Sequence, residues 1–199
     1  RLFISPASVV RFCKKLGFSG YSDFKASLRM DLFEPEETPR KSHPTDFFRD
    51  IHKTIEMVSE ETVERIVELI HCSRRIELYA VGSSRMPGSE LAKRLQTIGK
   101  AAFCYDDSTL MNISARQLTS DDLVLALSIS GETSLIIAAA TVAKSRGAAL
   151  VSFTNLGNNT LSGMADENLY VNATNFVCSG IQVQSRVQLL MLCEYLFFR

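Results

Sequence analysis

The sequence lacks the features that mark secreted, membrane-spanning and disordered proteins. No amino-terminal stretch has the basic, apolar and small-residue order of a signal peptide. The longest apolar runs, such as residues 135–143, stop well short of the roughly 20 residues that a membrane-spanning helix needs. Hydrophobic residues make up 46% of the 199-residue chain and charged residues 22%, which excludes wholesale disorder. We therefore expect a globular cytoplasmic protein with no membrane contact, large enough for one α/β domain and a small appendage.

Paired cysteines and the common nucleotide fingerprints are also missing. The five cysteines are odd in number and form no C-x-x-C pair, a usage typical of buried apolar residues in a reducing compartment. Neither a G-x-G-x-x-G spacing nor a G-K-[ST] triplet occurs, which disfavours a nucleotide site. We expect no cofactor and no metal site.

Charge is unevenly distributed, although 22 basic and 22 acidic side chains give the whole chain a net charge of zero. Residues 1–32 carry six basic and two acidic side chains, so this segment is +4 and the remainder is −4. A basic segment joined to an acidic domain suggests an anionic partner at one end only. Because the chain starts with Arg1 rather than methionine, we also expect its true start to be missing.

Composition divides the chain into three parts. Residues 1–32 are basic and helical in pattern, and residues 33–45 hold three prolines and five charged side chains, which is typical of a linker. Residues 46–199 are the predicted main domain. It opens with two amphipathic helical stretches, and Ser59 is the predicted cap of the second. The apolar positions of these stretches are Phe47, Phe48, Ile51, Ile55 and Val58, then Val63, Ile66, Val67 and Ile70.

After them, apolar runs alternate with helical patterns. Strands are predicted at residues 76–81, 101–105, 123–129, 148–154 and 168–171. Helices are predicted near residues 86–98, 109–117, 132–146, 159–164 and 181–198. Runs this apolar are typical of strands buried on both faces. The predicted fold is therefore doubly wound α/β, a three-layer parallel sheet flanked by helices, preceded by an incomplete helical segment.

Two turns that follow predicted strands are rich in hydroxyl groups. They are Gly82-Ser83-Ser84 and the segment 128–133, which reads S-I-S-G-E-T. Ligands of such sheets bind beyond the carboxyl ends of the strands, where hydroxyls and the free N–H groups of the next helix suit a phosphate. Serine and glycine are also common in such turns as simple helix caps. Two such turns favour an anion site for a small phosphorylated ligand.

These residues resemble the sugar isomerase (SIS) phosphosugar-binding domain over about residues 46–199. The shared pattern is a G-x-S turn, an S-x-S-G-x-T turn and an apolar strand that ends in Thr154-Asn155. The resemblance implies a flavodoxin-like fold and a phosphate held by the two turns. The implied phosphosugar-binding residues are Ser83, Ser84, Ser128, Ser130, Gly131 and Thr133, with Asn155 and Arg186. Asn155 would contact the sugar, order its loop or simply form a turn. Arg186 would reach a phosphate or a partner subunit, or pair with a surface carboxylate.

The run from Val10 to Phe24, within residues 5–25, resembles the end of the helix-turn-helix of RpiR-type transcription regulators. Those regulators join such a DNA reader to a SIS domain through a linker, the order found in this chain. The resemblance implies an operator DNA partner for the full-length protein.

The residues themselves fit a short DNA-reading helix. Ser5 is suited to cap it, Pro6 to lie in its first turn and Gly17 to end it. Helical spacing places Val9, Phe12, Cys13 and Leu16 on one apolar stripe, which leaves polar and cationic side chains on the opposite side. The expected DNA-binding residues are Ser5, Ser8, Arg11 and Lys15. A solvated charged face is the alternative interpretation.

Only four residues precede Ser5, so the helices that should support the recognition helix are absent from this sequence. We therefore expect residues 1–32 to be poorly ordered or packed against something else, and DNA binding to belong to the full-length protein.

A sugar-phosphate sensor is favoured over an enzyme. Isomerisation of a phosphosugar needs a positioned base and often a histidine, yet His43, His52 and His71 do not follow predicted strands. Glu132, expected to point to solvent or to favour a helix amino-terminus, and Glu194 are the carboxylates nearest to the predicted site. The alternatives are an aldose–ketose phosphosugar isomerase and a structural SIS domain with a degenerate pocket. The last predicted helix is apolar nearly all round, which suggests a homodimer or higher homo-oligomer.

Overall fold

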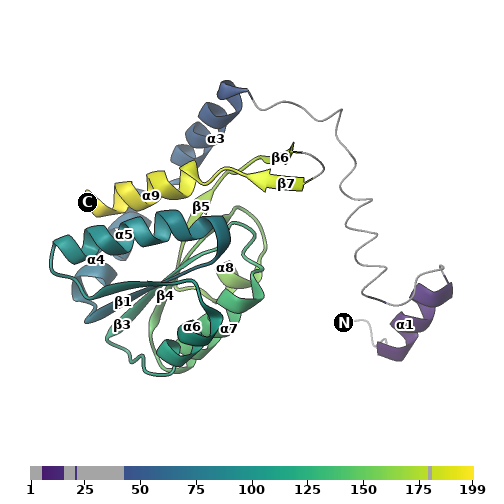
Figure 1. The fold of residues 1–199 in the computed structure, drawn as a ribbon, viewed down its shortest axis with the longest axis horizontal. Helices are drawn as coiled ribbons and strands as arrows, with labels where there is room; N and C mark the ends of the chain where they lie inside the picture. Colours follow the sequence, from purple (N-terminus) through teal and green to yellow (C-terminus); the bar gives the residue numbers. More distant parts are fainter. Residues whose placement is uncertain (1–5, 16–20, 22–42, 179–180) are drawn as a thin grey trace. The chain divides into compact units, whose positions relative to one another are not determined.

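A computed structural model describes residues 6–15, 21, 43–178 and 181–199 of the chain (Figure 1). The chain divides into two compact units, residues 1–40 and residues 41–199, and each is described by itself. No helix among the described residues is long and apolar enough to cross a membrane.

The first unit contains helix α1 (Pro6–Lys15), which confirms a helix beginning at Pro6. Cys13 is buried and Val9 is half-buried, but Phe12 is 55% exposed. The packed stripe of this helix is therefore narrower than predicted. Ser5, Leu16 and Gly17 lie outside the described residues, as does most of the segment 1–32 whose poor order was expected.

The second unit is built on a five-stranded parallel sheet with strand order β2-β1-β3-β4-β5. The strands are β1 (Arg75–Ala80), β2 (Ala102–Tyr105), β3 (Asp122–Leu127), β4 (Ala149–Asn155) and β5 (Glu167–Val171). Every predicted strand is present, with ends that shift by one or two residues. The predicted doubly wound α/β fold is confirmed, and the strand order is the flavodoxin-like one.

Helices cover both faces of the sheet because alternate strand residues point to opposite sides. Leu123, Leu125 and Leu127 belong to the core beneath one set of helices, whereas Val124 and Ala126 belong to the core beneath the other set. The first set is α4 (Glu60–Cys72), α5 (Arg85–Thr97) and α9 (Val187–Phe197). The second set is α6 (Ser108–Ala115), α7 (Ser134–Ser145) and α8 (Thr160–Met164). Burial on both faces explains the apolar character of β1, β3 and β4.

Helix α3 (Pro44–Met57) begins inside the segment predicted to be a linker. His43 is its N-cap and forms a capping box with Asp46, and Pro44 occupies the first helical position. Proline is preorganised for that position, and the capping box satisfies free N–H groups. The predicted linker therefore extends too far, because residues 43–45 at its end form the start of α3.

The same helix turns its polar side toward the domain. Asp50 is fully buried and accepts hydrogen bonds from Asn172 and Thr174, the latter at 2.7 Å from the hydroxyl. Phe48 and Ile55, in contrast, are 70% and 55% exposed. The amphipathic pattern that predicted the helix is correct, but its apolar side faces outward.

A β-hairpin precedes the last helix, where the sequence predicted helix from residue 181. Strands β6 (Asn175–Cys178) and β7 (Ile181–Gln184) pair antiparallel, and α9 begins only at Val187. The segment 181–184 alternates apolar and polar residues, which is the period of a strand rather than a helix. The helix was predicted to start too early because a longer apolar pattern directly follows this short strand.

The cysteines are only partly as predicted. Cys13 and Cys193 are buried and Cys104 is half-buried, and no disulfide joins the cysteines whose side chains the structure describes. Cys72, however, is exposed at the end of α4, where its thiol donates to a Glu68 carboxylate oxygen at 3.1 Å. This hydrogen bond raises the pKa of the Cys72 thiol.

Candidate functional site

The two hydroxyl-rich loops lie next to each other at one edge of the sheet. Strands β1 and β3 are direct neighbours, with Ala80 opposite Leu127, so the loops that leave them begin side by side. The chain then turns to opposite faces, into α5 after β1 and into α7 after β3. In doubly wound sheets this reversal, the topological switch point, is where ligands bind.

The first loop is a single 3₁₀ turn, Gly82–Ser84, that runs directly into α5. Gly82 has φ +58°, a left-handed conformation that favours glycine, and a Cβ there would meet no atom within 4 Å. Ser83 is exposed, whereas Ser84 is 5% exposed. One hydroxyl therefore faces solvent, and the other points into the protein.

The second loop, residues 128–133, is folded by its own hydroxyl groups. The hydroxyls of Ser128 and Thr133 lie 2.8 Å apart, and the hydroxyls of Ser128 and Ser130 lie 3.5 Å apart. The Glu132 amide donates to the Ser130 hydroxyl at 3.2 Å, and the Gly131 amide donates to the Ser128 carbonyl at 2.9 Å. The turn thus gathers three hydroxyl groups from six consecutive residues.

Gly131 allows this turn to pack against the loop that follows β4. Its φ is +64°, and a Cβ would lie only 1.9 Å from the Asn159 side-chain oxygen. The Asn159 amide nitrogen donates to the Thr154 hydroxyl at 3.2 Å, and its oxygen accepts from the Ser162 amide at 2.9 Å. Asn159 is therefore fixed in place, and no larger residue than glycine fits at position 131.

Glu132 also ties the second loop to this neighbour. Its carboxylate accepts hydrogen bonds from the Thr160 amide at 2.7 Å and from the Thr160 hydroxyl at 2.9 Å. Glu132 was expected to point to solvent or to favour the amino-terminus of the helix that its own turn opens, but its carboxylate instead binds the first residue of α8. A carboxylate held in this way supports the turn.

Helix amino-termini at the two loops, like that of α9, lack the side-chain caps found at α3, α4, α6 and α8. Ser84 precedes α5 and Thr133 precedes α7, and neither side chain forms a capping hydrogen bond. Helices α4, α6 and α8 are instead capped by the side chains of Ser59, Asp107 and Asn159. At the first loop the helical run begins with the 3₁₀ turn, because the Arg85 N–H donates to the Gly82 carbonyl. Uncapped helical starts present N–H groups and the positive end of the helix dipole, and both favour an anion.

Arg186 joins the first loop from the other end of the chain. Its Nε donates to the Ser84 hydroxyl at 3.2 Å, and one terminal nitrogen donates to the Gln184 carbonyl at 2.8 Å. Burial lowers the pKa of this guanidinium, which forms no ion pair with any residue that the structure describes. Of the three expectations for Arg186, pairing with a surface carboxylate is thus not found among the described residues.

Asn155 orders its neighbouring loop. Its side-chain oxygen accepts a hydrogen bond from the Ala173 backbone amide at 3.2 Å, and its backbone N–H donates to the Ile129 carbonyl at 2.7 Å. These bonds link the end of β4 to the segment after β5 and to the start of the second loop.

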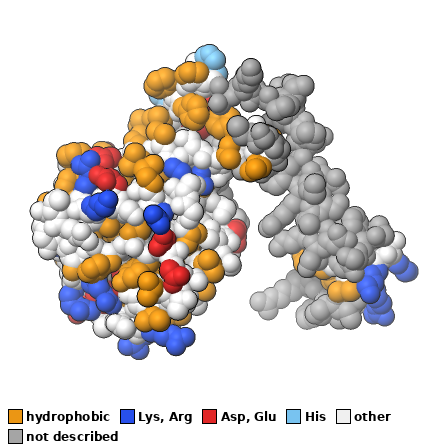
Figure 2. All heavy atoms as spheres, viewed as in Figure 1, with side chains coloured by type: hydrophobic (Ala, Val, Ile, Leu, Met, Phe, Trp, Pro, Cys, Tyr) orange, Lys and Arg blue, Asp and Glu red, His pale blue; other side chains and the backbone are white. Residues whose placement is uncertain are grey.

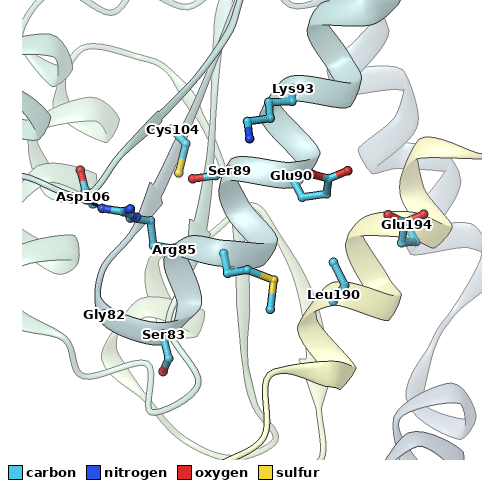
Figure 3. Close-up of a pocket in the computed structure, with 11 residues that line it drawn as sticks. Gly82, Ser83, Arg85, Ser89, Glu90, Lys93, Cys104, Asp106, Leu190 and Glu194 are labelled. Carbon is cyan, nitrogen blue, oxygen red and sulfur yellow. Dashed lines mark hydrogen bonds and ion pairs between the residues drawn. The ribbon is translucent and has the colours of Figure 1, made fainter.

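A cavity of about 850 Å³ runs along α5 between the end of β2 and α9 (Figure 3). It reaches the first loop at Gly82 and Ser83, but the second loop does not line it. Arg85 and Asp106 both line this cavity and form an ion pair at 2.5 Å, which lowers the pKa of the Asp106 carboxyl. The switch point, rather than this cavity, therefore brings together the predicted phosphate-binding residues.

Neither candidate base for an isomerase is free at the site. The Glu194 carboxylate, which lines the cavity along α5, pairs with Arg94 of α5 at 2.9 Å, and Glu132 is held by Thr160. The histidines lie on the first two helices of the unit: His43 caps α3, His52 pairs with Glu56 at 3.3 Å on α3, and His71 ends α4.

On α1, the cationic residues predicted to contact DNA share one exposed side. Arg11 and Lys15 are exposed and lie one helical turn apart, and Ser8 is half-buried. Ser5 lies outside the described residues.

The chain matches two known protein families and a curated regulator. Residues 69–199 match the SIS domain, and residues 1–35 match the helix-turn-helix domain of the rpiR family. The chain belongs to the RpiR family of transcription regulators. The HTH-type transcriptional regulator RpiR of Escherichia coli K12 is 27% identical over 210 residues, which cover 98% of this chain and 71% of that protein.

Solved structures place this RpiR-family chain among SIS folds. The Vibrio vulnificus NanR protein complexed with ManNAc-6P is 32% identical, with a TM-score of 0.76 over 96% of this chain and 72% of that one. The phosphoheptose isomerase GmhA of Neisseria gonorrhoeae has a TM-score of 0.63 over 77% of this chain and 94% of that one. At 17% identity, the second likeness shows the fold alone.

Proposed function

We propose that this regulator senses a phosphorylated sugar at the switch point between β1 and β3. The observation that carries the proposal is the pair of uncapped helix amino-termini, α5 and α7, beside a cluster of serine and threonine hydroxyls. A phosphate dianion accepts many hydrogen bonds and is stabilised by positive helix ends, so it matches both features. The phosphate ligands of the proposal are Ser83, Ser84, Ser128, Ser130, Gly131 and Thr133, with Arg186 behind Ser84.

Two further observations support a phosphosugar sensor over an isomerase. NanR, which was solved with ManNAc-6P, is similar over nearly the whole of this chain. The carboxylates Glu132 and Glu194 are engaged in structural contacts with Thr160 and Arg94. A proton transfer between adjacent carbons needs a free base that faces the sugar, and both carboxylates are already held by these partners.

Phosphorus NMR tests the proposal directly. The chain is mixed with glucose 6-phosphate, fructose 6-phosphate, ribose 5-phosphate, N-acetylglucosamine 6-phosphate and N-acetylmannosamine 6-phosphate in turn. The expected result is a shifted or broadened phosphorus signal for at least one compound, with no new peak growing over time. New peaks would show isomerisation and overturn the sensor, and unchanged signals for the whole panel would contradict sugar-phosphate binding.

The DNA-reading half of the proposal rests on α1. Arg11 and Lys15 are exposed on one side of a helix, and that geometry suits base edges and phosphates of operator DNA. Occupation of the SIS domain would shift the protein between two states of different operator affinity. In the full-length regulator, Arg11→Ala should weaken operator binding while sugar-phosphate binding stays unchanged. Operator affinity that ignores every sugar phosphate would refute the coupling.

A homodimer through the outward apolar side of α3 and the β6–β7 hairpin completes the proposal. Phe48 is 70% exposed and Ile181 is 65% exposed, and the rings of Phe47 and Phe176 lie 5.4 Å apart, which joins helix to hairpin. Figure 2 shows hydrophobic side chains gathered over the α3 end of this unit. An exposed apolar face of this kind suits a two-fold dimer interface, and a dimer matches an operator with two half-sites.

Sedimentation measures the dimer. The wild-type chain should sediment as a dimer at micromolar concentration, whereas the double substitution Phe48→Glu with Ile55→Glu should yield a folded monomer. A wild-type monomer at high micromolar concentration, or a double variant that still dimerises, would exclude this face.

A further inference from the structure

Gln188 stands apart from the other polar side chains of the second unit. It is completely buried, and neither its amide nitrogen nor its amide oxygen has a hydrogen-bond partner among the described residues. Buried amides are normally paired, because an unmade hydrogen bond is costly. The other unpaired buried atoms belong to Arg75 and Asp122, which form ion pairs with Glu77 and Arg74 at the opposite, amino-terminal end of the strands.

The position of Gln188 brings it to the loops of the proposed phosphate site. It is the second residue of α9, on the side of the helix that continues through Leu192 and Leu196 into the core. That core includes Ala80, Leu127 and Ile129, which are the last residues of β1 and β3 and the first turn beyond them. Gln188 therefore occupies the end of the buried face that lies nearest to the two loops.

Helix geometry directs its side chain toward the same place. Side chains in α-helices lean toward the helix amino-terminus, over the preceding turn. The residue two positions earlier, Arg186, donates to the Ser84 hydroxyl at 3.2 Å. The amide of Gln188 therefore lies near the amino-terminal end of α9, the end that Arg186 fastens to the first loop.

We propose that Gln188 recognises the sugar part of the ligand, with its amide bonded to sugar hydroxyls while the two loops hold the phosphate. A side-chain amide offers one acceptor oxygen and two N–H donors, and a sugar hydroxyl both donates and accepts, so the two groups are complementary. Such an arrangement discriminates strongly between sugars, because a sugar without the matching hydroxyl leaves the buried amide unpaired. This inference rests on the proposed phosphosugar site and adds to it the residue that selects the sugar.

The substitution Gln188→Met separates this role from a structural one. Methionine has nearly the same shape but no hydrogen-bonding amide, so a side chain without a partner in the protein can be replaced at no loss in thermal midpoint. Dissociation constants are measured by calorimetry for inorganic phosphate and for the tightest sugar phosphate of the NMR panel. We expect the variant to bind the sugar phosphate about tenfold or more weakly, with its affinity for inorganic phosphate unchanged. Gln184→Met, four residues earlier on β7, is the matched control and should leave both constants as in the wild type.

Each outcome has a distinct meaning. Equal sugar-phosphate affinity in the wild type and in Gln188→Met would overturn the inference and leave the proposed function standing. A lower thermal midpoint with unchanged selectivity among sugar phosphates would show a structural amide and would also overturn it. A wild-type chain that binds inorganic phosphate but no sugar phosphate would refute the proposed function itself. Gln188→Leu repeats the comparison with a second apolar side chain, so that a misfolded methionine variant does not leave the result open.

Discussion

The helix amino-termini of this domain fall into two groups that differ in what satisfies their N–H groups. At α4, α6 and α8, the side chains of Ser59, Asp107 and Asn159 accept hydrogen bonds from the first turn. At α5 and α7, Ser84 and Thr133 precede the helix without a capping bond, and α9 also lacks a side-chain cap. Backbone conformation separates the two serines, because Ser59 before α4 is extended whereas Ser84, which ends the 3₁₀ turn, is helical with φ −72° and ψ −14°.

The hydroxyls at the uncapped ends have other partners. Thr133 lies 2.8 Å from the Ser128 hydroxyl, and Ser84 accepts from Arg186 at 3.2 Å. Both uncapped helices begin at the switch point of the sheet, where β1 and β3 run side by side. In the proposed function, the uncapped helix ends at the switch point serve to bind an anion, whereas side-chain caps stabilise α4, α6 and α8.

The largest effect on stability and on binding should come from Gly131→Ala, which disrupts the packing of the loop before α7 against Asn159, the cap of α8. The new Cβ would lie 1.9 Å from the oxygen with which Asn159 caps α8, at a residue with φ +64°. We expect a loss of about 3 kcal/mol or more in the free energy of unfolding and no measurable sugar-phosphate binding. Urea denaturation and calorimetry measure the two quantities.

Gly82→Ala is the control for backbone strain. Gly82 has φ +58°, but a Cβ there meets nothing within 4 Å, so the substitution should cost only about 1–2 kcal/mol. If both alanine variants lost equal stability, Asn159 would have no part in supporting the turn.

Thr133→Asp should convert the uncapped end of α7 into a capped one. The backbone at Thr133 is extended, with φ −70° and ψ 104°, as at the capped ends, so a carboxylate there is suited to bond the first turn. The free energy of unfolding should rise by up to about 1 kcal/mol, while sugar-phosphate affinity falls by about 100-fold or more through charge repulsion and loss of free N–H groups. Thr133→Asn, a neutral cap, should fall between this variant and the wild type. Unchanged affinity in Thr133→Asp would place the phosphate elsewhere.

Ser130→Ala should have a smaller effect that is confined to binding. Ser130 is exposed, and its hydroxyl accepts a hydrogen bond from the Glu132 amide at 3.2 Å. Affinity for the sugar phosphate should fall about tenfold, the usual loss for one hydrogen bond to a charged group, and stability should change by less than about 0.5 kcal/mol. A binding curve that matches the wild type would remove Ser130 from the site.

Ser59→Ala at the capped start of α4 should give the opposite result. Loss of the cap to the Thr62 amide should lower the free energy of unfolding by about 1 kcal/mol, with sugar-phosphate affinity unchanged. Thermal denaturation and calorimetry on this variant and on Ser130→Ala form a matched pair. If Ser59→Ala weakened sugar-phosphate binding, the proposal that only the uncapped helix ends bind the ligand would be contradicted.

Much of this arrangement was predictable from the sequence, for identifiable reasons. The buried strands are long apolar runs, and the two loops combine glycine with hydroxyl residues directly after β1 and β3. Such signals are local, so they survive without knowledge of the tertiary structure. The family resemblance that followed from these loops is confirmed by the match to the SIS domain.

Tertiary contacts account for what was missed. Asn159 and Gln188 lie in segments without any motif. Only the folded structure shows that Gly131 packs against Asn159 and that Gln188 is completely buried. The outward apolar side of α3 was equally hidden, because periodicity predicts an amphipathic helix but not which side faces the domain. The β6–β7 hairpin was lost because its four-residue strand adjoins a longer apolar pattern.

The most direct test of the account is amide NMR of the chain titrated with the sugar phosphate that binds. The account predicts large shifts for the backbone N–H groups in the first turns of α5 and α7, residues 85–87 and 134–136, and no comparable shifts in the first turns of α4 and α6. Pro87 has no amide proton and the Arg85 amide donates to the Gly82 carbonyl, so Met86 reports for the first turn of α5. Shifts spread equally over capped and uncapped helix ends, or confined to the cavity along α5, would contradict it.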